Sequence, residues 1–371
     1  MKKYVRPEII AMKGYVPGEQ PKPGEGLKLN TNENPYRASE KVYDAIRAAV
    51  DFGLSRYPDP IGRAVQNEVS RKFGVSPDMV LCGNGSDDLL TILTRTFVGN
   101  GELLRLPYPS YILYRSLAEI QGAYSDQIAF NADWTLPNAF YYDPVGQMAS
   151  VDRSNNLRLV FLPNPNSPSG TMLPKEQILE IAENLPCPLV VDEAYADFAG
   201  KTGDDGHWAE EHCIDLIERC DKIIVCRTLS KSYALAGLRF GFLVAVPKFI
   251  EQMMKVKDSY NCDTLSIAAA AAALADDDWL QDNRRKILAT RARLTKRMRQ
   301  LGFTVPTSHA NFTWNTRDDV PVQPIYEFLK QQGILVRYMD YPGWGDGLRI
   351  SVGTDEQTDR CVDLIQDYLA K

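Results

Sequence analysis

The sequence predicts an α/β protein in which a large, doubly wound and mostly parallel-sheet domain is joined to a smaller α+β domain. A length of 371 residues is enough for two domains. From about residue 78 to 250, short apolar runs alternate with helical patterns, which is typical of a parallel sheet covered by helices. After about residue 258 the pattern changes. We expect an N-terminal arm with part of the small domain at 1–44, the large domain at 45–257, and the small C-terminal domain at 258–371.

Short runs of Val, Ile, Leu and Phe that end in polar residues predict the strands of the large domain. They are MVLCGNG, ELLRLPYPSY, LRLVFLPN, CPLVVDEAY, DKIIVCRTLSK and LRFGFLVAV. A helical pattern begins at Asp87, another follows the second run, and PKEQILEIAENL gives a third. This order predicts successive strand–helix units.

The C-terminal part begins with a long charged helix through RRKILATRARLTKRMRQLG. Strand-like FTVPTSHANFTWN, a helix near IYEFLKQQG, strands ILVRY and LRISVG, and a final helix follow. The first forty or so residues are rich in Pro, Gly and Asn, so we expect them to drape over the rest. The apolar part of TLSIAAAAAALA spans roughly 11 residues, short of the ~20 that cross a membrane, and predicts a packed helix.

Composition excludes several classes of function. The net charge is −6, and the longest basic run, at 284–286, reads as a solvated helix face, so we expect no nucleic-acid partner. Seven scattered cysteines without a CxxC pair, and three histidines, disfavour a disulfide framework and a metal site. The N-terminus MKKYVRPEII has no unbroken apolar core of a secretory signal, which predicts a cytoplasmic protein.

Polar residues follow the ends of several predicted strands. Because ligands bind at the carboxyl ends of strands in open parallel sheets, we expect these residues to converge on one edge. In chain order they are Gly85, Ser86, Asp87, Tyr111, Asn166, Asp192, Tyr195, Thr228, Ser230 and Lys231, with Arg239 eight places later.

The residue types at that edge match the parts of one cofactor. GNGSDD suits a phosphate at a helix N-terminus, although it is also an ordinary helix cap. A carboxylate buried at Asp192 needs a partner, either a pyridinium nitrogen or a structural cap or salt bridge. Lys231, unless it is simply solvated, lies in apolar and hydroxylic surroundings that lower an amine pKa, as reaction with an aldehyde requires. Arg239 can hold a phosphate dianion, so the set describes a site for pyridoxal phosphate.

The chain also resembles a known family over nearly its whole length. The motifs, in chain order, are NTNENPY, SRYPDP, GNGSDD, NPNSPSG, VDEAYADF, TLSKSYALAGLRFG and LRISVGT. They resemble the fold-type I pyridoxal-phosphate aminotransferases, and most closely the histidinol-phosphate aminotransferases. The resemblance implies transamination between L-histidinol phosphate and 2-oxoglutarate, giving imidazole acetol phosphate and L-glutamate, in histidine biosynthesis.

Carried over by position, the resemblance implies roles at the cofactor. Lys231 would bind the aldehyde covalently and later move a proton, Asp192 would pair with the ring nitrogen, and Tyr195 would contact the phenolic oxygen. Tyr111 would stack on the ring. The phosphate would be held by Thr228, Ser230, Arg239 and the backbone near Gly85, Ser86 and Asp87.

Other implied roles concern the ring oxygen, the second subunit and the substrate. Asn166 is assigned to the ring oxygen, although many relatives have asparagine directly before the proline, where this chain has Ser167. Tyr57 would reach the cofactor phosphate of a neighbouring subunit, which implies a homodimer with composite sites. Arg337 and Arg349 would bind the substrate anion, unless they form structural ion pairs, and Tyr15 and Asn34 would line the same pocket.

Three alternative functions remain open. Two are enzymes of the same fold, an aromatic or broad-specificity aminotransferase and a phosphothreonine decarboxylase. The third is a catalytically silent regulator that binds the cofactor. Such a regulator should carry a DNA-binding domain, and the short segment before residue 30 and the acidic balance argue against one.

Overall fold

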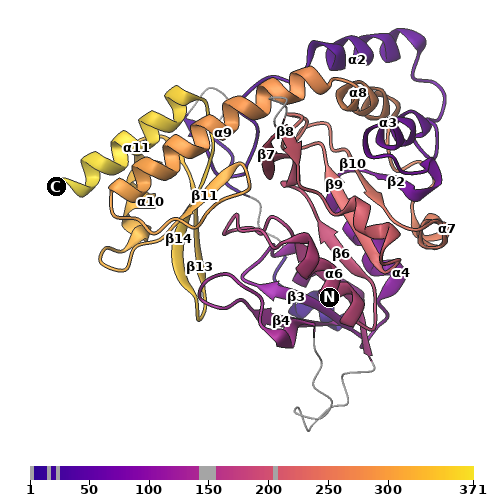
Figure 1. Ribbon diagram of the computed structural model, residues 1–371, viewed down its shortest axis with the longest axis horizontal. Helices are drawn as coiled ribbons and strands as arrows, with labels where there is room; N and C mark the ends of the chain where they lie inside the picture. Colours follow the sequence, from indigo (N-terminus) through magenta and orange to yellow (C-terminus); the bar gives the residue numbers. More distant parts are fainter. Residues whose placement is uncertain (1–3, 15–17, 22–25, 142–155, 204–207) are drawn as a thin grey trace.

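A seven-stranded sheet forms the centre of the larger part of the molecule (Figure 1). The computed structural model describes residues 4–14, 18–21, 26–141, 156–203 and 208–371. Neighbouring strands are parallel except around β10, which runs antiparallel to both β2 and β9. In spatial order the strands are β2 (Val80–Gly83), β10 (Gly241–Val244), β9 (Ile223–Thr228), β6 (Leu189–Asp192), β5 (Leu157–Pro163), β3 (Leu103–Tyr108) and β4 (Tyr124–Ala129).

Both faces of this sheet are buried, which explains why its central strands are continuous apolar runs. Side chains alternate between the faces, so Val80 and Cys82 join one core cluster while Leu81 joins the other. The first face is covered by α3 (Arg63–Phe73), α6 (Lys175–Asn184) and α8 (Thr264–Leu274). The second is covered by α4 (Ser86–Phe97), α5 (Leu113–Gln121) and α7 (Pro247–Val256).

The smaller part is built on a three-stranded antiparallel sheet in the order β11-β14-β13. Its strands are β11 (Phe312–Asn315), β14 (Gly345–Ser351) and β13 (Arg337–Tyr341). The long helix α9 (Asp277–Gln300) extends from α8 toward this sheet, where α10 (Val322–Gln331) and α11 (Asp355–Leu369) also pack (Figure 1). The N-terminal segment joins this part, because β1 (Leu27–Lys28) pairs with β12 (Ile334–Leu335).

The remaining elements are short or lie at the edges. Helix α2 (Glu40–Phe52) packs against α8, α1 (Pro7–Ala11) lies against α5, and β7 (Gly200–Thr202) pairs with β8 (Trp208–Glu210). Short 3-10 helices occur at Pro77–Met79, Asn138–Phe140, Ala196–Phe198 and Ile214–Glu218.

The predicted fold class is confirmed. Each apolar run predicted as a strand of the large domain contains one, but β4 was not predicted, and only Phe312–Asn315 of FTVPTSHANFTWN forms a strand. The domain limits stay a prediction, and α8 packs on α2 and α3 although it lies beyond residue 257.

In the part of the chain that the structure describes, no helix combines the length and apolar character needed to cross a bilayer. The same described residues contain no group of three or more His, Cys, Asp or Glu able to hold a metal ion.

Candidate active site

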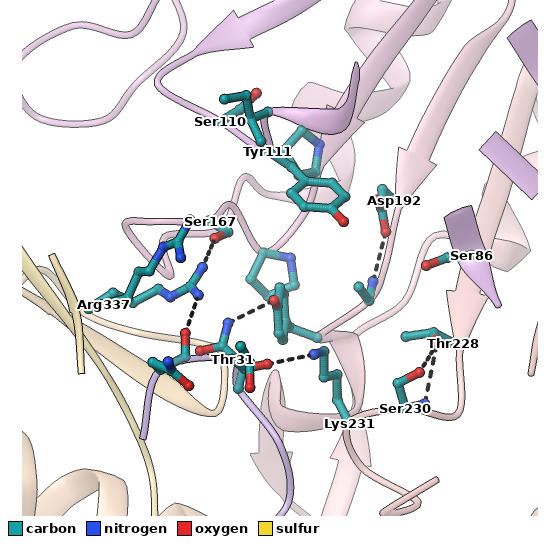
Figure 2. A pocket seen from close by; sticks show the side chains of 18 of the residues that line it. Thr31, Ser86, Ser110, Tyr111, Ser167, Asp192, Thr228, Ser230, Lys231 and Arg337 are labelled. Carbon is teal, nitrogen blue, oxygen red and sulfur yellow. Dashed lines mark hydrogen bonds between the residues drawn. The ribbon is translucent and has the colours of Figure 1, made fainter. Parts of the chain in front are cut away.

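A cavity of about 510 Å³ opens at the carboxyl ends of β5, β6 and β9. Parallel neighbours in the sheet end at the same edge, so residues far apart in the sequence meet there. Figure 2 shows the side chain of Lys231 across this space from Tyr111, with Asp192 on the adjoining wall. The predicted site residues that line the cavity are Ser86, Asp87, Tyr111, Asp192, Tyr195, Thr228, Ser230, Lys231, Arg239, Arg337 and Arg349.

Lys231 follows the carboxyl end of β9 and, among the residues that the structure describes, is the lysine that lines the cavity. Its Nζ donates a hydrogen bond to the carbonyl oxygen of Thr31 at 3.0 Å. Burial, together with the nearby positive charge of Arg349, lowers the pKa of Lys231 to about 8. The amine is therefore close to half unprotonated at mildly alkaline pH, as a nucleophile or a general base must be.

Asp192 ends β6 and is only 5 % exposed. Its Oδ2 accepts a hydrogen bond from the hydroxyl of Tyr114 at 2.7 Å, and its Oδ1 accepts one from the backbone N–H of Ala194 at 3.1 Å. Burial raises the pKa of Asp192 to about 6, although both hydrogen bonds act in the opposite direction. The carboxylate is thus oriented and costly to ionise, which suits it to a cationic partner in the cavity.

The start of α4 and the loop after β9 form a cluster of hydrogen-bond donors. No side chain caps α4 at Gly85, whose φ is +82°. A Cβ at this position would lie 2.7 Å from Nη2 of Arg239, so glycine is what allows the guanidinium to approach the helix N-terminus. The hydroxyl of Thr228 donates to Ser230 at 3.0 Å. Arg239 donates long hydrogen bonds to Ser230 Oγ and to the carbonyl oxygen of Ala236, and it forms a half-exposed, 3.4 Å ion pair with Asp87. These weak contacts leave it able to bind an external anion.

Arg337 and Arg349 occupy directly opposite positions on β13 and β14. Arg349 donates to Oγ of Ser167 at 2.9 Å and to the carbonyl oxygen of Asn30 at 3.0 Å, and its guanidinium lies 5.3 Å from the ring centre of Phe312. Within the described residues, neither arginine has a carboxylate at ion-pair distance. The structural ion pairs considered above are therefore absent there, and two positive charges face the cavity.

Several predicted site residues lie away from the cavity. Asn34 donates to the carbonyl oxygens of Lys231 and Ser232 at 3.0 and 3.1 Å. Asn166 is buried behind the wall and donates to Ser169 Oγ at 2.9 Å, while its Oδ1 has no partner among the described residues. Tyr57 is 81 % exposed. Their predicted roles stay predictions, and Tyr15 lies outside the described residues.

Sequence patterns did not indicate several residues that shape the cavity. Tyr114 contacts Asp192 across 78 positions of sequence, and Asn32 contacts Tyr195 across 163. Ser167 replaces Asn166 at the cavity wall and binds Arg349. One feature of the sequence marked this position: in NPNSPSG the asparagine lies one place earlier than in many relatives. That difference does not show which side chain faces the ligand.

Comparisons with known proteins show the family of the chain. The model of the family described as aminotransferase class I and II matches residues 24–365. The chain belongs to this family of enzymes, and the edge of the sheet described above corresponds to the place where α/β folds bind ligands.

The similarity is closer to one group within the family. The chain is 54 % identical to the histidinol-phosphate aminotransferase of Rhodopirellula baltica, over 97 % of this chain and 94 % of that protein. It is 42 % identical to the enzyme of that name from Syntrophotalea carbinolica, over 98 % and 99 % of the two chains. A solved structure of histidinol-phosphate aminotransferase from Sinorhizobium meliloti, in complex with pyridoxal-5'-phosphate, has a TM-score of 0.82 at 26 % identity and covers 98 % of both chains.

Proposed function

We propose that this chain transfers the amino group of L-histidinol phosphate to 2-oxoglutarate, with pyridoxal 5'-phosphate as cofactor. The products are imidazole acetol phosphate and L-glutamate, and the reaction is a step of histidine biosynthesis. Near full-length similarity to the histidinol-phosphate aminotransferases of R. baltica and S. carbinolica supports this substrate.

The observation that carries the proposal is the pair of arginines on adjacent strands of the small sheet. A carboxylate needs one planar guanidinium, which binds both of its oxygens. A phosphate carries more charge and a third terminal oxygen, and a second cation can bind that oxygen. Arg349 and Arg337 supply these two cations opposite one another, without a carboxylate partner among the described residues.

The residues at the cavity also fit the cofactor. The uncapped N-terminus of α4, the hydroxyls of Ser86, Thr228 and Ser230, and the guanidinium of Arg239 together suit a phosphate dianion. Asp192 is a buried acceptor suited to a protonated ring nitrogen. In the proposal Tyr195 contacts the phenolic oxygen, and Tyr111 lies against the ring.

Each group then has a defined part in the chemistry. Bound pyridoxal phosphate supplies a conjugated ring that accepts electrons from the substrate α-carbon. Lys231 would hold the cofactor through Nζ until the substrate amine displaces it, and the freed amine, whose pKa is about 8, would take the proton of the α-carbon. Asp192, held by Tyr114, keeps the proton on the ring nitrogen. Arg349 orients the substrate anion so that the α-carbon faces Lys231.

We further propose a homodimer in which Tyr57 completes the partner's cofactor site. An exposed apolar surface supports this, because large apolar patches mark interaction sites. Tyr57 stacks on Tyr260 with ring centres 4.5 Å apart. The neighbouring exposed apolar residues are Val50, Phe52 and Leu54. Sedimentation of the purified protein measures its mass, and a monomer at micromolar concentration would contradict the shared site. The cytoplasmic location stays a prediction.

The test of the substrate is an assay of the purified protein with competing amino donors and 2-oxoglutarate. We expect kcat/KM for histidinol phosphate to exceed that for phenylalanine by about 100-fold or more, because phenylalanine has no phosphate for the second arginine. Tyrosine and phosphothreonine are measured alongside. Equal values for histidinol phosphate, histidinol and phenylalanine would favour the broad-specificity aminotransferase, and release of CO₂ from phosphothreonine would favour the decarboxylase.

A further inference from the structure

Asn32 has an unusual backbone conformation beside the cavity. Its φ is +56°, a left-handed value that non-glycine residues seldom adopt, and it is 1 % exposed. Its backbone N–H donates to Oγ of Ser351 at 2.8 Å, and its carbonyl oxygen accepts from Nδ2 of Asn311 at 3.0 Å. Both partners belong to the small sheet region, so this conformation is held by contacts rather than left to solvent.

The hydrogen bonds fix which end of the Asn32 amide faces Tyr195. Oγ of Ser351 already accepts the backbone N–H of Asn32, and its single proton goes to Oδ1 of Asn32 at 3.0 Å. The NH₂ end therefore points the other way and donates to the hydroxyl oxygen of Tyr195 at 2.9 Å. If the Asn32 amide were reversed, its NH₂ group would face Ser351. The buried Ser351 hydroxyl would then lose the acceptor of its proton.

We propose that Asn32 is a positioning residue that fixes Tyr195 and strengthens it as a hydrogen-bond donor toward the cofactor ring oxygen. In this contact Asn32 is the donor and the hydroxyl oxygen of Tyr195 is the acceptor. A phenol oxygen that accepts a hydrogen bond becomes a better donor, because hydrogen bonds in a chain polarise one another. This role rests on the cofactor assigned under the proposed function.

Strand β14 carries Arg349 and also contacts Asn32 through Ser351. Ser351 lies two residues after Arg349 on β14, and Arg349 itself donates to the carbonyl oxygen of Asn30. The segment from Asn30 to Asn32 thus contacts the substrate-binding arginine at one end and Tyr195 at the other. The donor to Tyr195 therefore depends on the position of the small sheet.

The test uses the holoenzyme and the pH dependence of its visible absorption. Asn32→Gly removes the amide while permitting the positive φ, so the backbone is preserved. A weaker donor at Tyr195 leaves more electron density on the cofactor ring oxygen, and the bound cofactor then keeps its proton to higher pH. We expect the midpoint of the colour change to rise by about half to one pH unit, the effect of one ordinary hydrogen bond.

A double-mutant cycle separates this role from a structural one. Tyr195→Phe alone should raise the midpoint, and Asn32→Gly in the Tyr195→Phe background should change it no further. Ser351→Ala, which loosens the amide, should shift it in the same direction by less than Asn32→Gly does. Asn315→Ala removes another buried amide of the small sheet, one that donates to Leu348, and should leave the midpoint unchanged.

Two results would overturn the inference. One is an unchanged midpoint in Asn32→Gly with the cofactor bound, and the other is an equal shift with and without the Tyr195 hydroxyl. Failure of the proposed function would look different. A chain that binds no pyridoxal phosphate would show no visible band at all, whereas one that binds it but ignores histidinol phosphate would still give the predicted midpoint shift.

Discussion

Replacing Asp192 by asparagine should stabilise the cofactor-free protein while removing most of its activity. Burial raises the pKa of this carboxyl from 3.8 to about 6, so the folded apoprotein disfavours the ionised form. At 1.36 kcal/mol per unit, this difference corresponds to about 3 kcal/mol of lost stability at pH 8. Asparagine carries no charge, and its amide oxygen can still accept from Ala194, but its NH₂ end meets the buried Tyr114 hydroxyl, whose proton then loses its acceptor. The variant should therefore recover part of this free energy.

The sign of the effect gives a pH signature. Since the folded pKa is the higher one, the stabilisation from the protonated carboxyl is fully present below pH 3.8 and is lost as pH rises through about 6. The stability of Asp192→Asn relative to the wild type should thus be about 2.5 kcal/mol lower at pH 4 than at pH 8. Urea unfolding of both apoproteins at equal concentration measures it.

A matched control is Asp221→Asn, which removes an exposed carboxylate paired with Lys248 and should change stability little at either pH. A stability difference between Asp192→Asn and the wild type that is equal at pH 4 and pH 8 would refute the account of this carboxyl as a desolvated charge. Turnover of Asp192→Asn should fall by several orders of magnitude, because the neutral amide no longer keeps the ring nitrogen protonated. A loss under tenfold would make Asp192 structural.

Other predictions test the remaining parts of the site. Borohydride reduction of the holoenzyme should fix the pyridoxyl mass on Lys231, and a label on another lysine would contradict the assignment. Arg349→Ala should lower kcat/KM for both histidinol phosphate and glutamate by about 10- to 100-fold, the effect of one charge-assisted contact, whereas Arg337→Ala should affect histidinol phosphate more. Tyr57→Phe should weaken cofactor retention. Mixing Tyr57→Phe with Lys231→Ala chains should restore some intact sites, and strictly additive activity in proven heterodimers would exclude a shared site.

The sequence indicated the residues that follow the strands, because topology alone brings those together. Lys231, Asp192 and Thr228 come directly after apolar runs, and parallel strands place such positions on one edge. Strand β4 was missed since it reads YSDQIA, a polar edge strand without the apolar run of its neighbours. The antiparallel direction of β10 could not be inferred, because a buried strand has the same composition in either direction.

The contacts that tune the site were beyond sequence reasoning. Tyr114 lies at the start of α5 and resembles any core tyrosine until the fold brings its hydroxyl to Asp192. Asn32 belongs to a polar stretch that suggested a surface segment, yet it is almost fully buried. Such pairs depend on the register of distant elements and on the satisfaction of buried polar groups, neither of which leaves a local pattern.

Burial shifts the pKa values of Lys231 and Asp192 in opposite directions, and for this reason a bound ligand that pairs with both groups should stabilise the site. It lowers the pKa of Lys231 to about 8 and raises that of Asp192 to about 6, because in both cases the charged form is disfavoured. A molecule that brings a cation to Asp192 and an aldehyde to Lys231 would remove both costs at once, and its phosphate would neutralise the charge of Arg239. Cofactor binding must therefore stabilise the folded chain, and through linkage the apoprotein should unfold at lower denaturant concentration than the holoenzyme. The same desolvation that makes the amine nucleophilic thus also provides part of the affinity for the cofactor.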